Sequence, residues 1–150
     1  MNKSIWQIDN ESQQEPLTDE AVAKAEEILQ VKLPESYIDT LREQNGGYLL
    51  YDSYPTSVPT SWADDHIHVD HLKGIGEGGI LETGYLIEEW GLPKNIVLIS
   101  GDGHTWIALD YRRTSENPPV ILIEDDGETV IELAPNFSIF LEGLCQWEEE

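Results

Sequence analysis

The stretch from Leu33 to Tyr51 constrains the fold of this chain more than any other part of the sequence. Pro34 suits the first turn of a helix, where its missing N–H is no loss. The helix that follows has an apolar face with spacings of three and four residues, formed by Tyr37, Ile38 and Leu41. Asn45-Gly46-Gly47 then supplies residues that accept positive φ where a helix ends and the chain reverses. The apolar run from Tyr48 to Tyr51 predicts a strand, so this stretch places a helix over residues 34–44 beside a strand.

Another helix is predicted immediately before this stretch. Thr18 can cap its N-terminus, and Asp19 and Glu20 favour the positive end of its dipole. Its predicted buried face, at helical spacing, comprises Val22, Ala25, Ile28 and Leu29. Because the two helices are close in sequence, we expect them to pack as neighbours. Residues 1–16 are polar and are interpreted as an N-terminal segment that could add an edge strand.

The second half of the chain predicts strands with two more helices. Residues 81–90 are typical of an amphipathic helix whose inward side chains are Leu81, Tyr85, Leu86 and Trp90. The continuous apolar run 96–99 predicts the most buried strand, and residues 104–111, 120–124 and 129–133 predict hairpin strands. Asn136 can cap a closing helix with an apolar face. The predicted fold class is α+β, with a mostly antiparallel sheet of about four to six strands packed against the N-terminal helix pair and the C-terminal helix.

Length and composition indicate the number of domains and the cellular compartment of the protein. A chain of 150 residues is long enough to bury its own core, so we expect a single domain over residues 1–150. Cys145 is the only cysteine, which excludes an internal disulfide and suits a reducing compartment. Residues 1–10 do not resemble a signal peptide, and no run approaches the roughly 20 apolar residues of a membrane span. A soluble, cytoplasmic protein is therefore expected.

The net charge indicates the chemistry of a partner. Thirty acidic residues against eight basic ones give a formal charge of −22, well beyond the magnitude of about 2 to 8 that suffices for solubility. Nucleic acids and anionic membranes would repel such a chain, whereas a basic protein would complement it. The alternative is that the acidity reflects an acid-rich proteome or a halophilic habit, since net charge informs association and not fold.

The predicted loops contain the candidate partner-binding residues. Residues 52–65 are rich in proline, serine and threonine, and a loop of this length is usually functional or mobile. Trp62 within it is either an interface residue or a cover for the core. The candidate contacts lie at the loop and glycine-rich tips and are Asp52, Trp62, Asp64, Asp65, Glu77 and Asp102.

Residues 74–79 contain a literal GxGxxG pattern. A dinucleotide-binding loop should open a helix inside a βαβ unit, and the remainder of this chain predicts hairpins instead. Glu77 would also face the phosphates unfavourably. We therefore interpret the glycines as a connector and expect neither a nucleotide nor any other cofactor.

Residues 66–72 alternate as a strand, with Ile67, Val69 and His71 on one face. His66, His68 and Asp70 share the other face, where they could bind a divalent transition metal. A half-buried strand with a solvated polar side explains the same pattern, and no HExxH motif or cysteine pair supports a dedicated site. No metal ligand or catalytic residue is therefore assigned.

Several of these segments resemble the SUKH superfamily. The N-terminal part of the resemblance is formed by Ala25-Glu26, Leu29, Val31, Leu33-Pro34, Tyr37, Leu41 and Asn45-Gly46-Gly47. A later part is formed by Leu92-Pro93, 96–100, Gly101-Asp102-Gly103 and 107–110. The resemblance implies an α+β domain. It also implies a protein that acts by binding, as in the many bacterial immunity members that neutralise toxins, and so supplies no catalytic residue.

Two classes of function follow from the sequence. The first is an immunity-type protein whose acidic surface binds a basic toxin domain, such as a nuclease, because nucleases hold phosphates in cationic clefts. The second is a metal-dependent hydrolase that uses His66, His68 and Asp70. A regulatory scaffold is a further alternative, because the resemblance also extends to eukaryotic cell-wall regulators.

Overall fold

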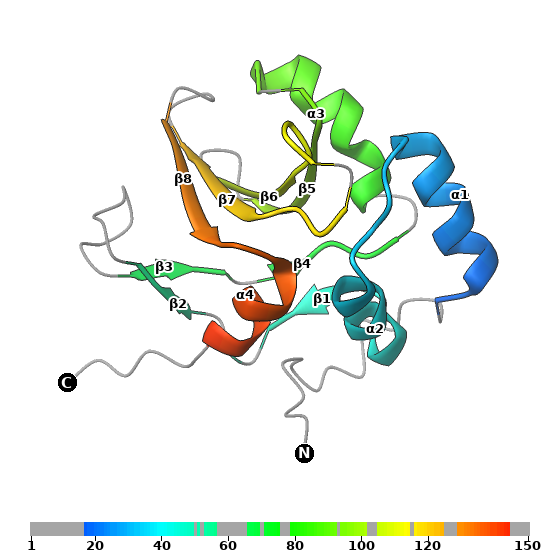
Figure 1. The fold of residues 1–150 in the computed structure, drawn as a ribbon, viewed down its shortest axis with the longest axis horizontal. Helices are drawn as coiled ribbons and strands as arrows, with labels where there is room; N and C mark the ends of the chain where they lie inside the picture. Colours follow the sequence, from blue (N-terminus) through cyan, green and yellow to red (C-terminus); the bar gives the residue numbers. More distant parts are fainter. Residues whose placement is uncertain are drawn as a thin grey trace.

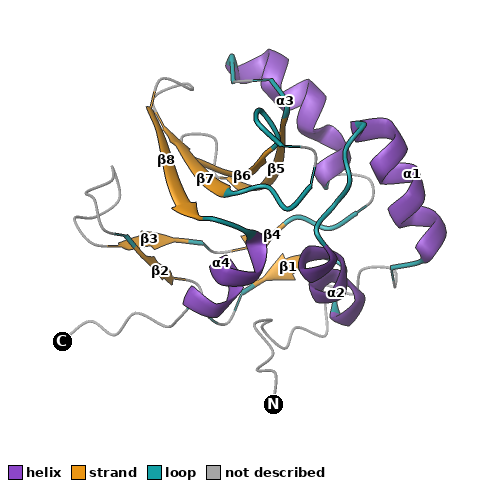
Figure 2. Cartoon of the chain, in the orientation of Figure 1, coloured by secondary structure: helices purple, strands orange, loops and turns teal. Residues whose placement is uncertain are grey.

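A computed structural model describes residues 17–49, 51, 53–56, 66–69, 71–75, 79–92, 94–101, 105–114, 116–124 and 129–144 (Figure 1). In these parts of the chain, helices lie on one side and at the lower edge of a curved antiparallel sheet, which gives the predicted α+β class (Figure 2). No helix among the described residues is long and apolar enough to cross a membrane.

The N-terminal helix pair forms as the local sequence predicts. Helix α1 spans Asp19–Leu29, and the Thr18 hydroxyl accepts a hydrogen bond of 3.1 Å from the N–H of Ala21. Gln30 takes a left-handed conformation (φ 56°) and ends this helix. Helix α2 spans Glu35–Glu43 and follows Pro34 directly. The predicted capping residues and the predicted helix start are therefore confirmed.

One predicted buried residue of α1 is exposed. Val22 and Ala25 are buried, and Leu29 packs partly buried against the core. Ile28, which we expected on the same buried face, is 52% exposed. That expectation is wrong because Ile28 lies in the last turn of α1, beside an open groove described below.

Four strands form the main sheet, in the order β5-β6-β7-β8, with each neighbouring pair antiparallel. They are β5 (Ile96–Gly101), β6 (Trp106–Asp110), β7 (Val120–Glu124) and β8 (Thr129–Ala134). Alternate residues of β5 belong to different clusters, since Val97 and Ile99 face the main core while Ile96 and Leu98 face a second, smaller cluster. Because both faces are covered, β5 is buried over 96–100, as its continuous apolar run predicts.

Two short antiparallel ladders extend beside this sheet. Strand β1 (Gly47–Tyr48) pairs with β4 (His71–Leu72), and β2 (Ser53–Pro55) pairs with β3 (His66–His68). We expected residues 52–65 to form a loop. That expectation is wrong at 53–55, because pairing with β3 makes these residues a strand whose first two side chains are buried. The N–H of Lys73, directly after β4, donates a 2.7 Å hydrogen bond to the carbonyl of Ile99. This bond joins the β1–β4 ladder to β5.

The predicted strand over 66–72 is therefore two strands. Ile67 and Val69 are buried as expected, but the alternation does not continue to His71. His71 is half-buried and its neighbour Leu72 is 1% exposed. The expectation that His71 shares the buried face is wrong, because β3 and β4 belong to separate ladders and the buried residue of β4 is Leu72.

Helix α3 covers part of the second face of the sheet. It spans Thr83–Trp90 after a 3-10 turn, η1 (Ile80–Glu82), and ends at Gly91, whose φ is +65°. Leu86 packs against the second cluster, as predicted. Tyr85, which we expected inward, is 64% exposed. That expectation is wrong because α3 covers the sheet with a narrow stripe that includes Leu86 and Ile87. Trp90 is 40% exposed, and its ring lies 6.1 Å from that of Trp106 in the second cluster, so it is inward in part.

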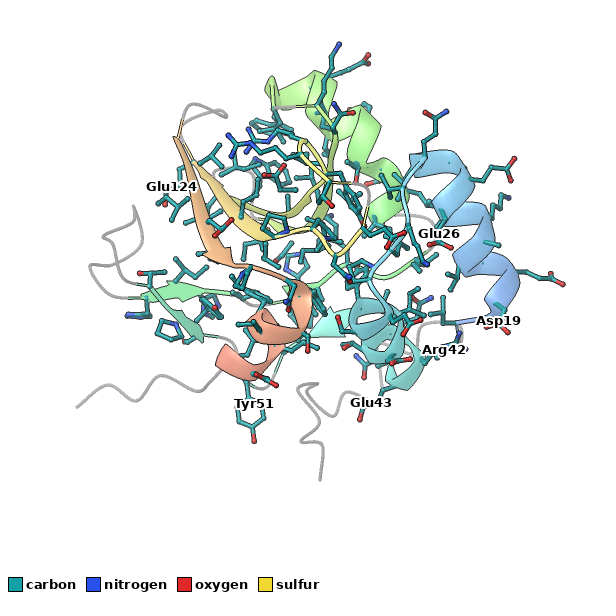
Figure 3. The ribbon with its side chains drawn as sticks, in the orientation of Figure 1. Asp19, Glu26, Arg42, Glu43, Tyr51 and Glu124 are labelled. Carbon is teal, nitrogen blue, oxygen red and sulfur yellow. The ribbon has the colours of Figure 1, made fainter. Side chains whose placement is uncertain are left out.

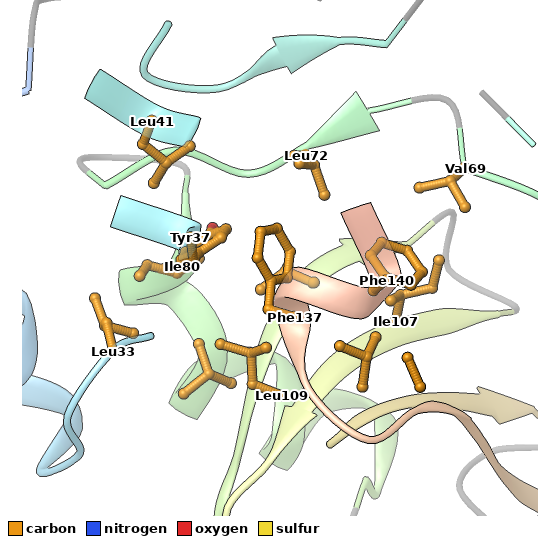
Figure 4. Packing of buried hydrophobic residues seen from close by; sticks show 14 of the residues in the cluster. Leu33, Tyr37, Leu41, Val69, Leu72, Ile80, Ile107, Leu109, Phe137 and Phe140 are labelled. Carbon is orange, nitrogen blue, oxygen red and sulfur yellow. The ribbon is translucent and has the colours of Figure 1, made fainter. Parts of the chain in front are cut away.

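The main core lies between the sheet, α2 and the closing helix α4 (Phe137–Gly143). Asn136 caps α4 as predicted, accepting a 2.9 Å hydrogen bond from the N–H of Ile139. The Phe137 ring meets that of Tyr37 edge-on at 5.0 Å, and the two rings occupy the centre of the cluster (Figure 4). The segments that form the candidate site pack against this core.

Candidate functional site

The residues of the N-terminal resemblance meet around the start of β1. The side-chain amide of Asn45 donates a 2.9 Å hydrogen bond to the carbonyl of Ile75 and accepts one of 2.8 Å from its N–H. The phenol of Tyr37 donates to the carbonyl of Lys73. Burial, and then the nearby Tyr111, raise the pKa of Tyr37, so this phenol remains a donor. These contacts bind α2 and its following turn to residues 73–75.

Two glycines allow this close approach of backbones. Gly46 has φ +92°, and a Cβ added there would lie 2.7 Å from the backbone nitrogen of Gly74. A Cβ on Gly74 would lie 2.2 Å from the carbonyl oxygen of Asn45. The first glycine of the GxGxxG pattern is therefore required by packing. Four more residues of the N-terminal resemblance are buried beneath this junction: Leu33, Pro34, Tyr37 and Leu41. The residues that carry the resemblance therefore stabilise the fold.

The predicted partner-binding residues Asp52, Trp62, Asp64, Asp65, Glu77 and Asp102 all lie outside the described residues. The same applies to residues 1–16 and to Asp70. These predictions therefore stay predictions.

The two histidines of the metal hypothesis lie on β3. His66 is half-buried opposite Pro55, and His68 is exposed opposite Ser53. No group of three histidine, cysteine or acidic side chains that could hold a metal occurs within the part of the chain that the structure describes. The described geometry adds no support to the hydrolase interpretation.

The described surface contains an open groove between α1 and α3, which we call the α1–α3 groove. Its volume is about 880 Å³. Apolar lining comes from Ile28, Leu29 and Val31 on one side and from Leu81 and Ile87 on the other. Glu26, Lys32 and Glu116 contribute charged groups to it. In Figure 1 the two helices and the loop after α1 surround this region at the upper right.

Hydrogen bonds fix the loop that forms one wall of the groove. The Glu26 carboxylate accepts a 2.8 Å hydrogen bond from the N–H of Leu33, and the phenol of Tyr111 donates to the carbonyl of Lys32. Burial, followed by the charge of Glu26, raises the pKa of Tyr111, so its phenol keeps this proton. These hydrogen bonds hold this wall of the groove in place in the isolated chain.

An ion pair flanks Tyr111, one of the residues that line the groove. Arg112 donates to Asp110 through Nε at 2.8 Å and through Nη2 at 3.1 Å, and its backbone N–H also donates to that carboxylate at 3.0 Å. Burial alone would raise the pKa of Asp110, but these hydrogen bonds and the charges of Arg112 and Arg113 lower it overall. Arg112 thus neutralises a buried acid beside Tyr111.

Four helical elements, of which α1, η1 and α3 line the groove, are strongly acidic. Nine exposed carboxylates lie on α1, α2, η1 and α3, at Asp19, Glu20, Glu27, Glu35, Asp39, Glu43, Glu82, Glu88 and Glu89. The same four elements contain two basic residues, Lys24 and Arg42, of which Arg42 is paired with Asp19 at 2.8 Å (Figure 3). These four elements therefore carry an excess of exposed negative charge.

The sequence did not predict the groove. Its lining comes from four separated segments, within 26–32, 81–87, 95–96 and 111–116, which only the fold brings together. One local signal was present, since Gly84 interrupts a segment of otherwise helical pattern.

A comparison with protein families finds a match over residues 16–143 to the SMI1 / KNR4 family (SUKH-1). The chain belongs to this family, which confirms the resemblance to the SUKH superfamily. A comparison with curated proteins finds no match. Membership supports, in coarse terms, a binding role without catalysis.

Proposed function

We propose that this member of the SMI1/KNR4 family is an immunity protein that neutralises a cognate bacterial toxin by direct binding. The observation that carries the proposal is the family match over residues 16–143, because SUKH proteins are generally of the non-enzymatic immunity type. The chain would act as one domain, and a cytoplasmic location would place it where an incoming toxin acts.

The charge of the chain supports a basic partner, such as a nuclease domain. Nucleases present cationic clefts to phosphates, and a complementary acidic surface raises the association rate and disfavours wrong partners. The formal charge of −22 and the nine exposed carboxylates of the helices suit this role. The acids at Asp64 and Asp65, with Trp62, remain proposed contributors to the same contact.

Co-expression tests this proposal directly. The reading frames next to the gene for this chain are first searched for a toxin-like gene with a basic C-terminal domain. That domain is then expressed under a tight promoter, with and without this chain. We expect growth to be restored only when this chain is present, and the two purified proteins to elute together. Growth arrest in the presence of folded chain, with no complex on a sizing column, would contradict the proposal.

Elemental analysis separates this proposal from the hydrolase alternative. Protein purified without a chelator or an affinity tag should contain no stoichiometric transition metal. Stoichiometric zinc, nickel or iron that is lost on His66→Ala and His68→Ala substitution would favour a metal enzyme instead.

A further inference from the structure

We propose that the α1–α3 groove takes up a basic segment of the partner, with a lysine or arginine side chain lying along its apolar walls. This inference rests on the proposed function, because it assigns a surface to the same partner. The described residues that line this groove were not among the partner-binding residues expected from the sequence.

The first observation is an apolar side chain that the fold itself leaves exposed. Ile28 lies in the last turn of α1 and is 52% exposed while it lines the groove. Removing the exposed part of such an apolar side chain from water stabilises a complex. A partner that covers Ile28 would therefore gain free energy that the isolated chain does not gain.

The second observation is Gly84 in the facing helix. A glycine within a helix destabilises that helix relative to alanine. Gly84 does not have positive φ, and a Cβ added there would meet no heavy atom within 4 Å. The packing of this chain therefore does not require the glycine. Its effect is to leave one wall of the groove without a side chain, so that another chain can approach the helix closely.

Charge complementarity identifies the occupant. Glu26 and Glu116 line the groove, and α1 ends there with no basic residue in its last turn. The C-terminal end of a helix dipole is negative and attracts cations. Lys32 is the one cation among the described lining residues.

Lysine and arginine side chains match both parts of this surface. Their aliphatic stems lie well on apolar walls while the charged group stays near carboxylates and water. A basic toxin domain would offer such side chains at its surface. An acidic or purely apolar segment would match only one part of the groove.

The test compares substitutions of two exposed isoleucines, Ile28 at 52% and Ile139 at 43% exposure. Ile28→Arg places a cation in the groove, and Ile139→Arg places one on α4, where Ile139 is 43% exposed. Calorimetry measures the dissociation constant of each variant for the basic domain of the adjacent toxin reading frame. We expect Ile28→Arg to weaken binding at least about tenfold and Ile139→Arg to change it less than about twofold.

Each result has one meaning. If both variants bind like the wild type, or if both are weakened equally, the groove is not the docking surface, although the proposed function stands. If the wild-type chain itself does not bind, both proposals fail. Circular dichroism and urea unfolding establish that each variant is folded.

A second pair of variants covers the case in which Ile28→Arg does not fold. Gly84→Gln places a neutral side chain on the groove wall, where the space for its Cβ is open. Ala23→Gln adds the same side chain at an exposed position of α1 that does not line the groove. We expect Gly84→Gln alone to weaken binding several-fold, and equal affinities would overturn the inference.

Discussion

Asn45 and Ile75, thirty residues apart in sequence, are joined by two hydrogen bonds, in which the Asn45 side-chain amide satisfies both backbone groups of Ile75. Asn45→Ala would leave both backbone groups of Ile75 without this partner. Each unsatisfied buried polar group costs about 1–3 kcal/mol, so we expect a loss of about 2 kcal/mol or more in the free energy of unfolding.

Asn136→Ala is the matched control for this substitution. It removes a single cap hydrogen bond, from the N–H of Ile139, and should cost about 1 kcal/mol. Urea unfolding of both variants gives the comparison. Equal losses would show that the Asn45 side chain acts only as a local turn residue.

Glycine substitutions should act in opposite directions at two sites. Gly74→Ala places a Cβ 2.2 Å from the Asn45 carbonyl oxygen, so the junction must open, at a cost of about 3 kcal/mol or more. Gly84→Ala meets open space in a helix and should stabilise the free chain by about 0.5–1 kcal/mol. Thermal and urea unfolding measure both effects. A destabilised Gly84→Ala variant would show that the helix needs this glycine, which removes one support for the groove.

Asp110 should make stability depend on acid pH. Its pKa in the folded chain lies below the ordinary value of 3.8, because the hydrogen bonds and charge of Arg112 outweigh the effect of burial. A lowered folded-state pKa contributes stability that is fully present above the unfolded-state pKa and is lost as pH falls through the folded-state pKa. The difference in unfolding free energy between wild type and Asp110→Asn should therefore be constant from pH 7 to about 5 and shrink below about pH 4.

Urea unfolding at several pH values checks this prediction. Glu142→Gln on α4 serves as the control, because Glu142 is exposed and should leave the pH dependence of stability nearly unchanged. A difference for Asp110→Asn that stays constant down to pH 2 would contradict the account of this ion pair.

Local chemistry was enough to predict the helices, most strands and their ends. Thr18, Pro34 and Asn136 each begin a helix by a mechanism within three or four residues, so no tertiary information was needed. The buried part of β5 over 96–99 was predictable for the same reason, since a continuous apolar run indicates a strand covered on both faces. The fold class followed from the order of these elements.

The sequence did not predict which apolar side chains at the edges of the helices are exposed. Ile28 and Tyr85 satisfy the helical spacing of their segments, yet both are exposed in the structure. Periodicity shows that a helix has an apolar stripe but does not show how far the covered surface extends along it. The α1–α3 groove could not be predicted because its walls come from four distant segments.

The central claim is that the acidic surface binds a basic toxin domain, and the salt dependence of the affinity tests it most directly. The measurement uses the domain of the adjacent toxin reading frame and two double variants with the same change in charge. Glu27→Lys with Glu88→Lys alters α1 and α3 beside the groove, and Glu132→Lys with Glu142→Lys alters β8 and α4. All four carboxylates are exposed.

We expect the wild-type affinity to fall steadily from about 0.1 M to about 1 M salt, where the screening length shrinks to about 3 Å. The first double variant should bind about tenfold more weakly than the second at low salt, and the difference should nearly vanish at about 1 M. An affinity that neither salt nor either charge reversal alters would contradict the claim.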